Sequence, residues 1–464
     1  MVKRVAGYVL LLLLALQATG AFAAPGGQQI GVNVMLRGKL TSAIRAELNT
    51  YGTVLDVLDP INALTMRSPM GNLSRIRALS YVVSATPDTE RLSGPAANIP
   101  VADFADGINV WDLDAINVTD AQSPGRAVPF DGAGVYVAVL DTGLVEDWRS
   151  YFPAERIASE YARAFGGGGG EHGTVSSQPD KWQKDTNSHG THVAGTILGF
   201  SLSGLPGDFG GPWVNGVAPQ VKVIPIKAFG QGYRALSWAS RIAQAILYVA
   251  DLKAGPLKHA PVVINMSFGG PEPNAVEQAA VDYAIAKGVI LVASAGNEGA
   301  SGMGYPAAYA PIVSVAASGW VGQWTSPATS WPFSDVPDPT NPDDFYIADF
   351  SSRQLSGQDL DVVAPGAWII GPYQFNAGQI TYGMPSGTSM AAPHVTGIVA
   401  LMLQKQPTLS QARVEAILED AAIPIAPGSR QIIDPNVGMI TVSWGADATG
   451  KGLIIADRAL LATQ

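Results

Sequence analysis

Apolar side chains in the larger, C-terminal part of the chain gather into short unbroken runs. Val and Ile are prominent in these runs, which lie at residues 135–140, 221–226, 262–265, 289–294 and 312–316. Runs of this composition are typical of strands buried on both faces of a sheet. Residues 238–252 and 276–287, between the runs, are predicted to be helices. The alternation predicts an α/β fold with a doubly wound, mostly parallel sheet and helices on both faces.

The N-terminal part has a different pattern that predicts a separate small unit between about residues 28 and 90. Strands are predicted at 30–36, 54–57, 63–66 and 81–83, and helices at 41–48 and 73–79. The order strand-helix-strand-strand-helix-strand predicts a small α+β, ferredoxin-like unit. Residues 91–112 have no such periodicity and contain Gly94, Pro95 and Pro100, so they are predicted to form a linker.

The first residues have the features of a secretory signal. Lys3 and Arg4 precede an apolar stretch at 9–16, and Ala21 and Ala23 suit a cleavage site after residue 23. The apolar stretch is short for a bilayer span, and an uncleaved anchor is the alternative. We therefore expect a secreted protein, extracellular or periplasmic. The chain has no cysteine, which excludes a cysteine protease and means that a large core must supply the stability.

Charge also distinguishes the two parts. Residues 1–91 carry nine basic and five acidic side chains, so the remaining 19 basic and 33 acidic side chains give the rest a formal charge of −14. Opposite charge favours association of the two parts, and an acidic surface argues against nucleic-acid binding. Acidity as a solubility trait of a secreted protein is an equal alternative.

Two residues stand where catalytic groups are often found. Ser389, among small residues, precedes the apolar run 395–403 and is predicted to lie at a helix N-terminus. Unpaired N–H groups and the helix dipole there favour a developing alkoxide, although a Ser at this place can also be only an N-cap. Asp141 ends the strand 135–140, and catalytic groups collect at the carboxyl ends of parallel strands. An Asp that only caps the turn gives the same pattern.

Two further residues have suitable chemistry. His189 lies among small residues before a predicted helix, and an imidazole titrates where a general base must. His189 and His192 are alternatively an i, i+3 metal pair, but no third His or HExxH-like Glu accompanies them. Asn297 follows a buried strand, and its amide can donate to an oxyanion. A turn Asn after Gly296 is the alternative.

These residues occur in the order Asp141, His189, Asn297, Ser389, and with their surrounding motifs they resemble the subtilisin family of serine proteases. The matching motifs run through nearly all of the chain from about residue 110 onward. They are the blocks 139–143, 189–195, 263–271, 295–299 and 387–394. The resemblance implies a subtilisin-like fold and a serine endopeptidase.

The resemblance also implies a role for each residue. Ser389 would attack the peptide carbonyl, His189 would carry the proton, and Asp141 would orient the imidazole. Asn297 and the backbone N–H of Ser389 would bind the oxyanion. No cofactor is required for this chemistry, and structural calcium stays an open possibility.

Substrate contacts follow from the same resemblance. An extended peptide would pair with an edge strand formed by Ser267, Phe268 and Gly269. The pocket for the residue before the scissile bond would have Gly304 at its floor and a wall formed by Ala293, Ser294, Ala295 and Gly296. None of these is acidic, so we predict a roomy, uncharged pocket that prefers Phe, Tyr, Leu or Met to Lys or Arg. Phe268 would narrow the pocket for the residue four before the bond, unless it is a packed core residue.

The family organisation implies a precursor. Its parts would be a signal peptide (1–23), an inhibitory, folding-assisting prosegment (24–91), a linker with the self-cleavage bond (92–112) and a catalytic domain (113–464). We expect protein or peptide substrates, the chain's own prosegment as intramolecular inhibitor, a monomer, no nucleic acid and no membrane after signal cleavage. An ordinary accessory domain is the alternative for the N-terminal unit.

Departures from the family pattern bear on metal binding. The loop 201–211 is glycine-rich, without the Asn-containing calcium loop of secreted subtilisins, and Ser150 stands near an expected calcium-binding Asp. Residues 320–345 are an insertion whose carboxylates suit a hard cation, but they lack the Asp-x-Asp-x-Asp-Gly spacing, which favours a surface loop.

Two other functions stay open at this stage. One is a catalytically silent relative that binds peptides, against which the intact set of four residues argues. The other is a maturation protease with a narrow substrate range, which a restricted cleavage profile would indicate.

Overall fold

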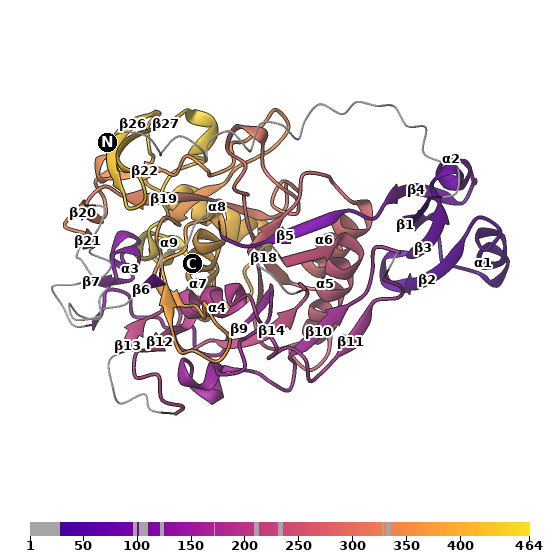
Figure 1. The fold of residues 1–464 in the computed structure, drawn as a ribbon, viewed down its shortest axis with the longest axis horizontal. Coiled ribbons are helices and arrows are strands. Elements are labelled where there is room, and N and C mark those ends of the chain that lie inside the picture. Colours follow the sequence, from indigo (N-terminus) through magenta and orange to yellow (C-terminus); the bar gives the residue numbers. More distant parts are fainter. Residues whose placement is uncertain are drawn as a thin grey trace, which may run out of the picture.

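The computed structural model describes residues 28–95, 100–101, 110–120, 125–170, 172–207, 213–230, 235–326, 329–330 and 336–464. The predicted signal peptide lies outside these residues, as do parts of the predicted linker and of the insertion 320–345. Figure 1 shows a small unit at the N-terminal end of the described chain and a larger unit that holds the rest.

A nine-stranded sheet forms the centre of the larger unit (Figure 1). Its order is β11-β10-β14-β9-β16-β18-β19-β22, with β23 also paired to β19. The strands are β9 (Tyr136–Asp141), β10 (Arg163–Gly166), β11 (Ser176–Gln178), β14 (Lys222–Lys227), β16 (Val262–Met266), β18 (Val289–Ser294), β19 (Val313–Trp320), β22 (Phe345–Ile347) and β23 (Val362–Pro365). Only β11 and β22 pair antiparallel with their neighbours.

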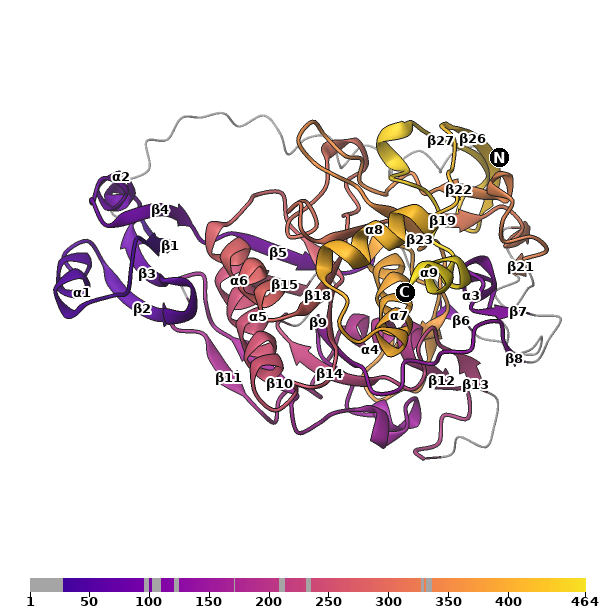
Figure 2. The same ribbon diagram turned by 180° about the vertical axis from the view of Figure 1, so that it is seen from behind.

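Helices pack on both faces of this sheet (Figures 1 and 2). On one face lie α4 (His189–Leu198) and α7 (Thr388–Lys405), and on the other α5 (Ala239–Ala254) and α6 (Ala275–Ala286). Every residue of α4, and all of α7 except its last two, is buried, as expected of helices that are apolar on all sides. Helices α8 (Gln411–Ala421) and α9 (Ala456–Ala462) follow. The predicted α/β fold is confirmed.

The small unit has its own sheet, in the order β2-β3-β1-β4. Its elements are β1 (Gln29–Leu36), α1 (Ser42–Leu48), β2 (Thr53–Leu58), β3 (Ala63–Pro69), α2 (Leu73–Arg77) and β4 (Val82–Pro87). A separate core contains Val32, Leu48, Leu64 and Met66, all fully buried. The predicted ferredoxin-like order of strands and helices is therefore present.

Polar contacts join the small unit to the larger one at the N-termini of α5 and α6. Asp88 accepts hydrogen bonds from the N–H (3.0 Å) and the hydroxyl of Ser240 in the first turn of α5. Asn33 donates to the side chain of Asn274, the N-cap of α6, at 3.3 Å. Carboxylates near helix N-termini are stabilised by the unpaired N–H groups there.

The glycine run 166–170 is part of this contact. A Cβ on Gly170 would lie 2.4 Å from the Cα of Gly31 in β1, and Gly170 has a φ of +71°. A side chain there would clash with the β1 backbone and would also strain the conformation. The run thus permits close approach of the two units.

The segment between the units forms strand β5 (Glu90–Ser93). It lies between β15 (Ala235–Trp238) and β17 (Phe268–Gly269), antiparallel to both. The predicted boundary at residues 91/92 thus falls inside a strand. Figure 1 shows β5 running from the small unit into the larger one.

Shorter elements complete the larger unit. They are α3 (Trp111–Ala115), β6 (Pro100–Val101), β7 (Thr119–Asp120), β8 (Gly125–Arg126), β12 (Gly199–Ser201), β13 (Trp213–Asn215), β20 (Trp324–Ser326), β21 (Thr329–Ser330), β24 (Gly371–Pro372), β25 (Tyr382–Gly383), β26 (Gly428–Asp434) and β27 (Gly438–Trp444). In the insertion 320–345, β20 and β21 pair, and Asp343 forms an ion pair with Arg430 of β26.

Candidate active site

The predicted site residues meet at one edge of the large sheet. Asp141 is the last residue of β9, Ser267 directly follows β16, and Ser294 is the last residue of β18. These three strands are adjacent and parallel, so their carboxyl ends lie together. Helices α4 and α7 both begin beside this edge, with His189 as the first residue of α4 and Ser389 as the second of α7.

Asp141 and His189 are in direct contact. The Nδ1 of His189 lies 2.8 Å from Oδ1 of Asp141, and both side chains are fully buried. The same carboxylate oxygen accepts the N–H of Thr142 at 2.7 Å. The contact fixes the imidazole so that Nε2 is the nitrogen open to a further partner. Among the residues that the structure describes, Nε2 of His189 has no hydrogen-bond partner.

Ser389 exchanges hydrogen bonds with Ser267. Its Oγ donates to the carbonyl oxygen of Ser267 at 3.1 Å, and Oγ of Ser267 donates to the carbonyl oxygen of Ser389 at 2.8 Å. Asn265 in turn donates to Oγ of Ser267 at 2.9 Å. The structure thus brings Ser389 to the end of β16, with its hydroxyl on a backbone carbonyl.

Asn297 is held by the first residue of α7. Its Oδ1 accepts the N–H of Thr388 at 2.9 Å and the hydroxyl of Thr388 at 3.0 Å. With the amide oxygen engaged twice, the Nδ2 group is the end left to donate to another acceptor. Thr388 was not among the predicted site residues. The available signal in the sequence was a hydroxyl residue directly before Ser389. The motif alone does not indicate that this hydroxyl binds Asn297.

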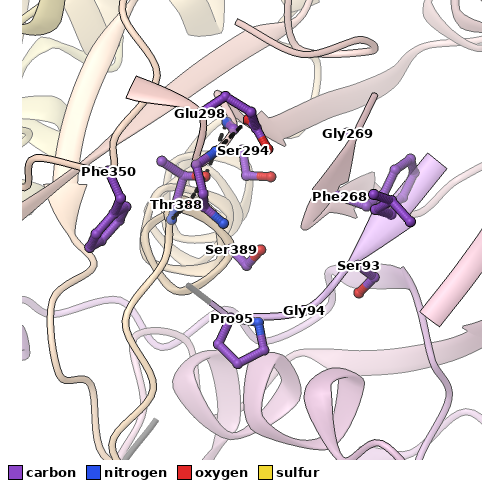
Figure 3. Close-up of a pocket in the computed structure, with 13 residues that line it drawn as sticks. Ser93, Gly94, Pro95, Phe268, Gly269, Ser294, Glu298, Phe350, Thr388 and Ser389 are labelled. Atoms are coloured by element: carbon purple, nitrogen blue, oxygen red, sulfur yellow. Dashed lines mark hydrogen bonds between the residues drawn. The ribbon is translucent and has the colours of Figure 1, made fainter. Parts of the chain in front are cut away.

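A cavity of about 260 Å³ opens beside Ser389. Figure 3 shows the side chains around it, with Ser389 near Gly94 and Pro95 and with Phe350 on the opposite side from Phe268. Its lining residues are Leu92, Ser93, Gly94, Pro95, Phe268, Gly269, Ser294, Gly296, Asn297, Glu298, Phe350, Thr388 and Ser389. The predicted peptide-binding strand and part of the predicted pocket wall therefore face one space.

Three predicted pocket residues do not line this cavity. Ala293 and Ala295 are fully buried and alternate with Ser294, because side chains of a strand point to opposite faces in turn. Gly304 lies behind Gly269, with its Cα 3.6 Å from where a Cβ of Gly269 would be. Its N–H donates to the carbonyl oxygen of Ala295 at 2.8 Å.

Glu298 and Phe350 also line the cavity, and neither was among the predicted site residues. Glu298 lines the cavity, and its Oε2 accepts the N–H of Asn297 at 2.7 Å and the hydroxyl of Ser352 at 3.2 Å. A carboxylate thus lies in the cavity with Ser294 and Gly296, the two predicted uncharged residues that line it. Phe350 comes from a segment more than fifty residues further along the chain, and no nearby motif marks it.

Phe268 is packed in the core. Its ring lies 4.9 Å from the ring of Phe229, centroid to centroid, and 2% of the residue is exposed. The ring of Phe268 is thus packed on Phe229, while the residue also lines the cavity beside Ser389.

The chain's own strand β5 lies across these residues. Phe268 and Gly269 pair with Ser93 and Leu92. The Oγ of Ser93 lies 3.1 Å from Nδ1 of His189 and 3.4 Å from Oδ1 of Asp141. Residues after β5 continue along the cavity, since Gly94 and Pro95 line it together with Ser389.

A second carboxylate lies near Asp141. Asp185 accepts the hydroxyl of Thr142 at 2.9 Å and the N–H of Asn187 at 2.8 Å. Burial raises the pKa of Asp185 to about 6, and the attraction of Lys227 opposes this shift. Sequence reasoning missed Asp185, whose link to the site through Thr142 depends on the fold.

The other two histidines near the site have packing roles. His192 has Nε2 2.9 Å from the carbonyl oxygen of Ile369, and burial lowers its pKa to about 3, so it is neutral. His394 lies 2.8 Å from Oδ2 of Asp112. In the part of the chain that the structure describes, no three His, Asp or Glu side chains group as metal ligands would.

Comparison with known sequences identifies similar proteins. The family model described as Peptidase_S8, the subtilase family, matches residues 132–451. Subtilisin BL of Lederbergia lenta is 33% identical over 312 residues, which are 67% of this chain and 90% of that protein. Fervidolysin of Fervidobacterium pennivorans is 31% identical over 438 residues, which are 88% of this chain and 52% of fervidolysin.

Solved structures give the same fold. Fervidolysin, described as a keratinolytic enzyme related to subtilisin, superposes with a TM-score of 0.62 at 24% identity, covering 94% of this chain and 61% of its own. Sphericase superposes with a TM-score of 0.53 at 26% identity, covering 76% of this chain and 99% of its own. Among the described residues, no helix combines the length and apolar character needed to cross a membrane.

Proposed function

Because this chain belongs to the subtilase family of subtilisin-like serine endopeptidases, we propose that Asp141, His189 and Ser389 are its catalytic triad. Ser389 attacks the peptide carbonyl to form an acyl-enzyme, and His189 takes its proton and returns it to the leaving amine. The observation that carries the proposal is the 2.8 Å contact of His189 with Asp141 at the sheet edge where α7 presents Ser389.

The first step needs a small movement of the serine. The Ser389 hydroxyl donates to the carbonyl oxygen of Ser267 and has to turn to Nε2 of His189 before it can be deprotonated. Asp141 stays ionised, holds the tautomer with Nδ1 protonated, and stabilises the imidazolium. Thr142 links the two carboxylates, because its hydroxyl donates to Asp185 and its N–H donates to Asp141, and so Asp185 contributes to the fixed geometry around Asp141.

Asn297 stabilises the developing negative charge. Thr388 holds the amide oxygen with two hydrogen bonds, which supports a role of Nδ2 as the oxyanion donor. The N–H of Ser389, near the start of α7, supplies the second donor. A donor fixed in advance needs no reorganisation during the reaction.

Peptide substrates pair with the strand Ser267-Phe268-Gly269. The antiparallel pairing of β5 with β17 and β15 supports this mode, because it is the pairing that an extended peptide would make. The side chain before the scissile bond enters the cavity walled by Ser294, Gly296 and Phe350. Large apolar or aromatic residues are preferred there, with Glu298 moderating that preference through its charge.

The chain is a secreted, self-processed precursor. Residues 24–91 act as inhibitory prosegment, and β5 blocks the site by occupying the peptide path beside His189 and Ser389. Cleavage within 92–112, in a monomer and after removal of residues 1–23, releases the enzyme. No cofactor takes part in the chemistry, and calcium, if bound, has a structural role.

Mass spectrometry of the precursor and its Ser389→Ala variant tests the proposal. The native chain is expected to split between residues 85 and 112, as N-terminal sequencing would show, while the variant stays whole. Ser429→Ala, which removes an exposed hydroxyl on β26, is the matched control and should process normally. An unprocessed native chain that also leaves casein intact would contradict the proposal.

A further inference from the structure

Arg91 is the side chain by which β5 is anchored in the larger unit. It is fully buried and forms a two-point ion pair with Glu277, with Nε to Oε1 at 2.9 Å and Nη2 to Oε2 at 2.6 Å. The carbonyl oxygen of Glu272 accepts a further bond from Nη2 at 3.1 Å. The fork of the guanidinium thus meets a carboxylate edge on, a geometry that lysine cannot reproduce.

Glu277 belongs to the larger unit, and its surroundings hold its carboxylate in place for Arg91. It lies in the first turn of α6, is fully buried, and accepts the hydroxyl of Tyr309 at 3.1 Å. Arg91 is the cation with which Glu277 pairs among the described residues. Removal of the prosegment would leave this carboxylate without a cation, and a buried charge without a partner is strongly unfavourable.

The position of Arg91 along β5 fixes which substrate residue would replace it. Ser93 contacts His189, and Gly94 lines the cavity together with Ser389 and Asn297. We place the scissile bond of a peptide on the same path after the residue at position 94, one residue beyond the one that contacts His189. Counting back from that bond, the residue at position 91 is the fourth.

We propose that Glu277, with Tyr309 and the carbonyl oxygen of Glu272, is an arginine-selective subsite for the fourth residue before the scissile bond of substrates. The proposal rests on the proposed protease function and adds a specificity to it. The enzyme would recognise two substrate residues. An apolar residue would enter the cavity beside Ser389, and an arginine would form an ion pair with Glu277. Phe268, predicted to narrow that subsite unless it is a packed core residue, has its ring packed on Phe229.

Fluorogenic peptides test this inference on the processed enzyme. The series acyl-X-Leu-Ser-Phe-aminocoumarin has Arg, Lys, Gln or Leu at X. We expect kcat/KM for X = Arg to exceed that for X = Leu by roughly 10- to 100-fold, the range expected for a charged, desolvated contact. Lysine should lie between them, because it cannot make both hydrogen bonds.

Two variants assign the selectivity to Glu277. Glu277→Gln should bring the Arg-to-Leu ratio near one, whereas Asp282→Asn, an exposed acidic residue on the same helix, should keep the native ratio. If Glu277→Gln fails to fold around Arg91, the double variant Arg91→Leu, Glu277→Leu replaces both partners of the ion pair, so that neither charge is left buried alone in the precursor. The processed double variant should prefer X = Leu. Equal cleavage of Arg and Leu peptides by the native enzyme, or an arginine preference that survives in the double variant, overturns the proposal.

Fluorescence anisotropy of the same labelled peptides separates this inference from the protease function. Hydrolysis without arginine selectivity overturns the subsite and leaves the protease function. Arginine-selective binding without any hydrolysis overturns the protease function and supports the subsite. Moving Arg to the fifth position should remove the preference, and a preference that persists there also contradicts the subsite.

Discussion

The start of strand β5 and the residue that follows its end meet the larger unit through different chemistry. Arg91 enters a closed, charged site and makes two hydrogen bonds to Glu277. Three residues later, Gly94 has no side chain and leaves a cavity of about 260 Å³ beside Ser389. One end is filled and paired, whereas the other is open.

The difference indicates that one contact positions the strand, whereas the other lies beside the proposed nucleophile. A buried ion pair with good geometry fixes the register of an extended strand. Gly94, beside Ser389, has no side chain to fill the cavity that a substrate side chain would occupy. Little apolar surface is therefore buried at this position. The start of β5 is therefore held by the Arg91 pair, while the residue after β5 leaves the cavity beside Ser389 unfilled. Changes at the two ends should affect rate and binding differently.

The largest effect is expected at the reacting end. Ser389→Ala and His189→Ala should each lower kcat by roughly a million-fold, as loss of the corresponding residues does in subtilisin. The double variant should lose no more than either single one, because the two residues act as a unit. Hydrolysis of a chromogenic peptide by each protein, purified with a prosegment cleaved by an added protease, would measure this. Additive losses would contradict a shared proton transfer.

A smaller effect is expected at the oxyanion donor. Asn297→Leu should lower kcat by about 100- to 1000-fold with little change in KM, because the contact forms mainly in the transition state. Thr388→Val removes one of the two bonds to the amide oxygen and keeps its backbone N–H, so its loss should be roughly tenfold. Steady-state kinetics of both variants would measure the difference. A change confined to KM would show that the amide binds the ground state instead.

Sequence alone named the residues that the structure brings together around Ser389. Asp141 and Asn297 follow buried strands, and His189 and Ser389 stand at helix starts, so local patterns and the family resemblance identified them. The strand order and the layers of helices also follow from the alternation of apolar runs. These features depend on residues close together in the chain.

The anchoring end was not predicted, because it depends on distant contacts. Arg91 and Glu277 are 186 residues apart, and each alone has the appearance of an ordinary surface charge. Phe350 was missed for the same reason, since only the fold brings it to the cavity. The pairing of β5 was hidden in a segment whose glycine and prolines are typical of a linker.

At the anchoring end, Arg91→Leu should loosen β5 without touching the nucleophile. In the uncleaved Ser389→Ala precursor, loss of one partner of this buried pair should lower the free energy of opening β5 by about 3–5 kcal/mol. Ser93→Ala should lower it by only about 1 kcal/mol. Amide hydrogen exchange across β5 would measure both. Recovery of protection by adding Glu277→Leu to Arg91→Leu would assign the loss to the unpaired carboxylate, and equal losses at both positions would contradict a dominant anchor.

Asp361 is a buried carboxyl group that accepts hydrogen bonds but, among the described residues, forms no ion pair with a cation. It accepts the N–H of Ser314 at 2.6 Å and the hydroxyl at 2.8 Å. Burial, with the nearby Glu415 and Asp359, raises its pKa to about 8 despite these bonds.

The folded chain thus keeps a proton that the unfolded chain releases near pH 4, so the free energy of unfolding should fall as pH rises from about 4 to 8. The slope from this group is at most about 1.4 kcal/mol per pH unit. Asp361→Asn should remove this component, and its advantage over the native residue should grow between pH 5 and pH 8 in urea unfolding of the Ser389→Ala precursor. A difference independent of pH would mean that solvent or an unseen partner keeps Asp361 ionised. In that case Glu277 without Arg91 should also stay ionised, and loss of its cation should cost little stability.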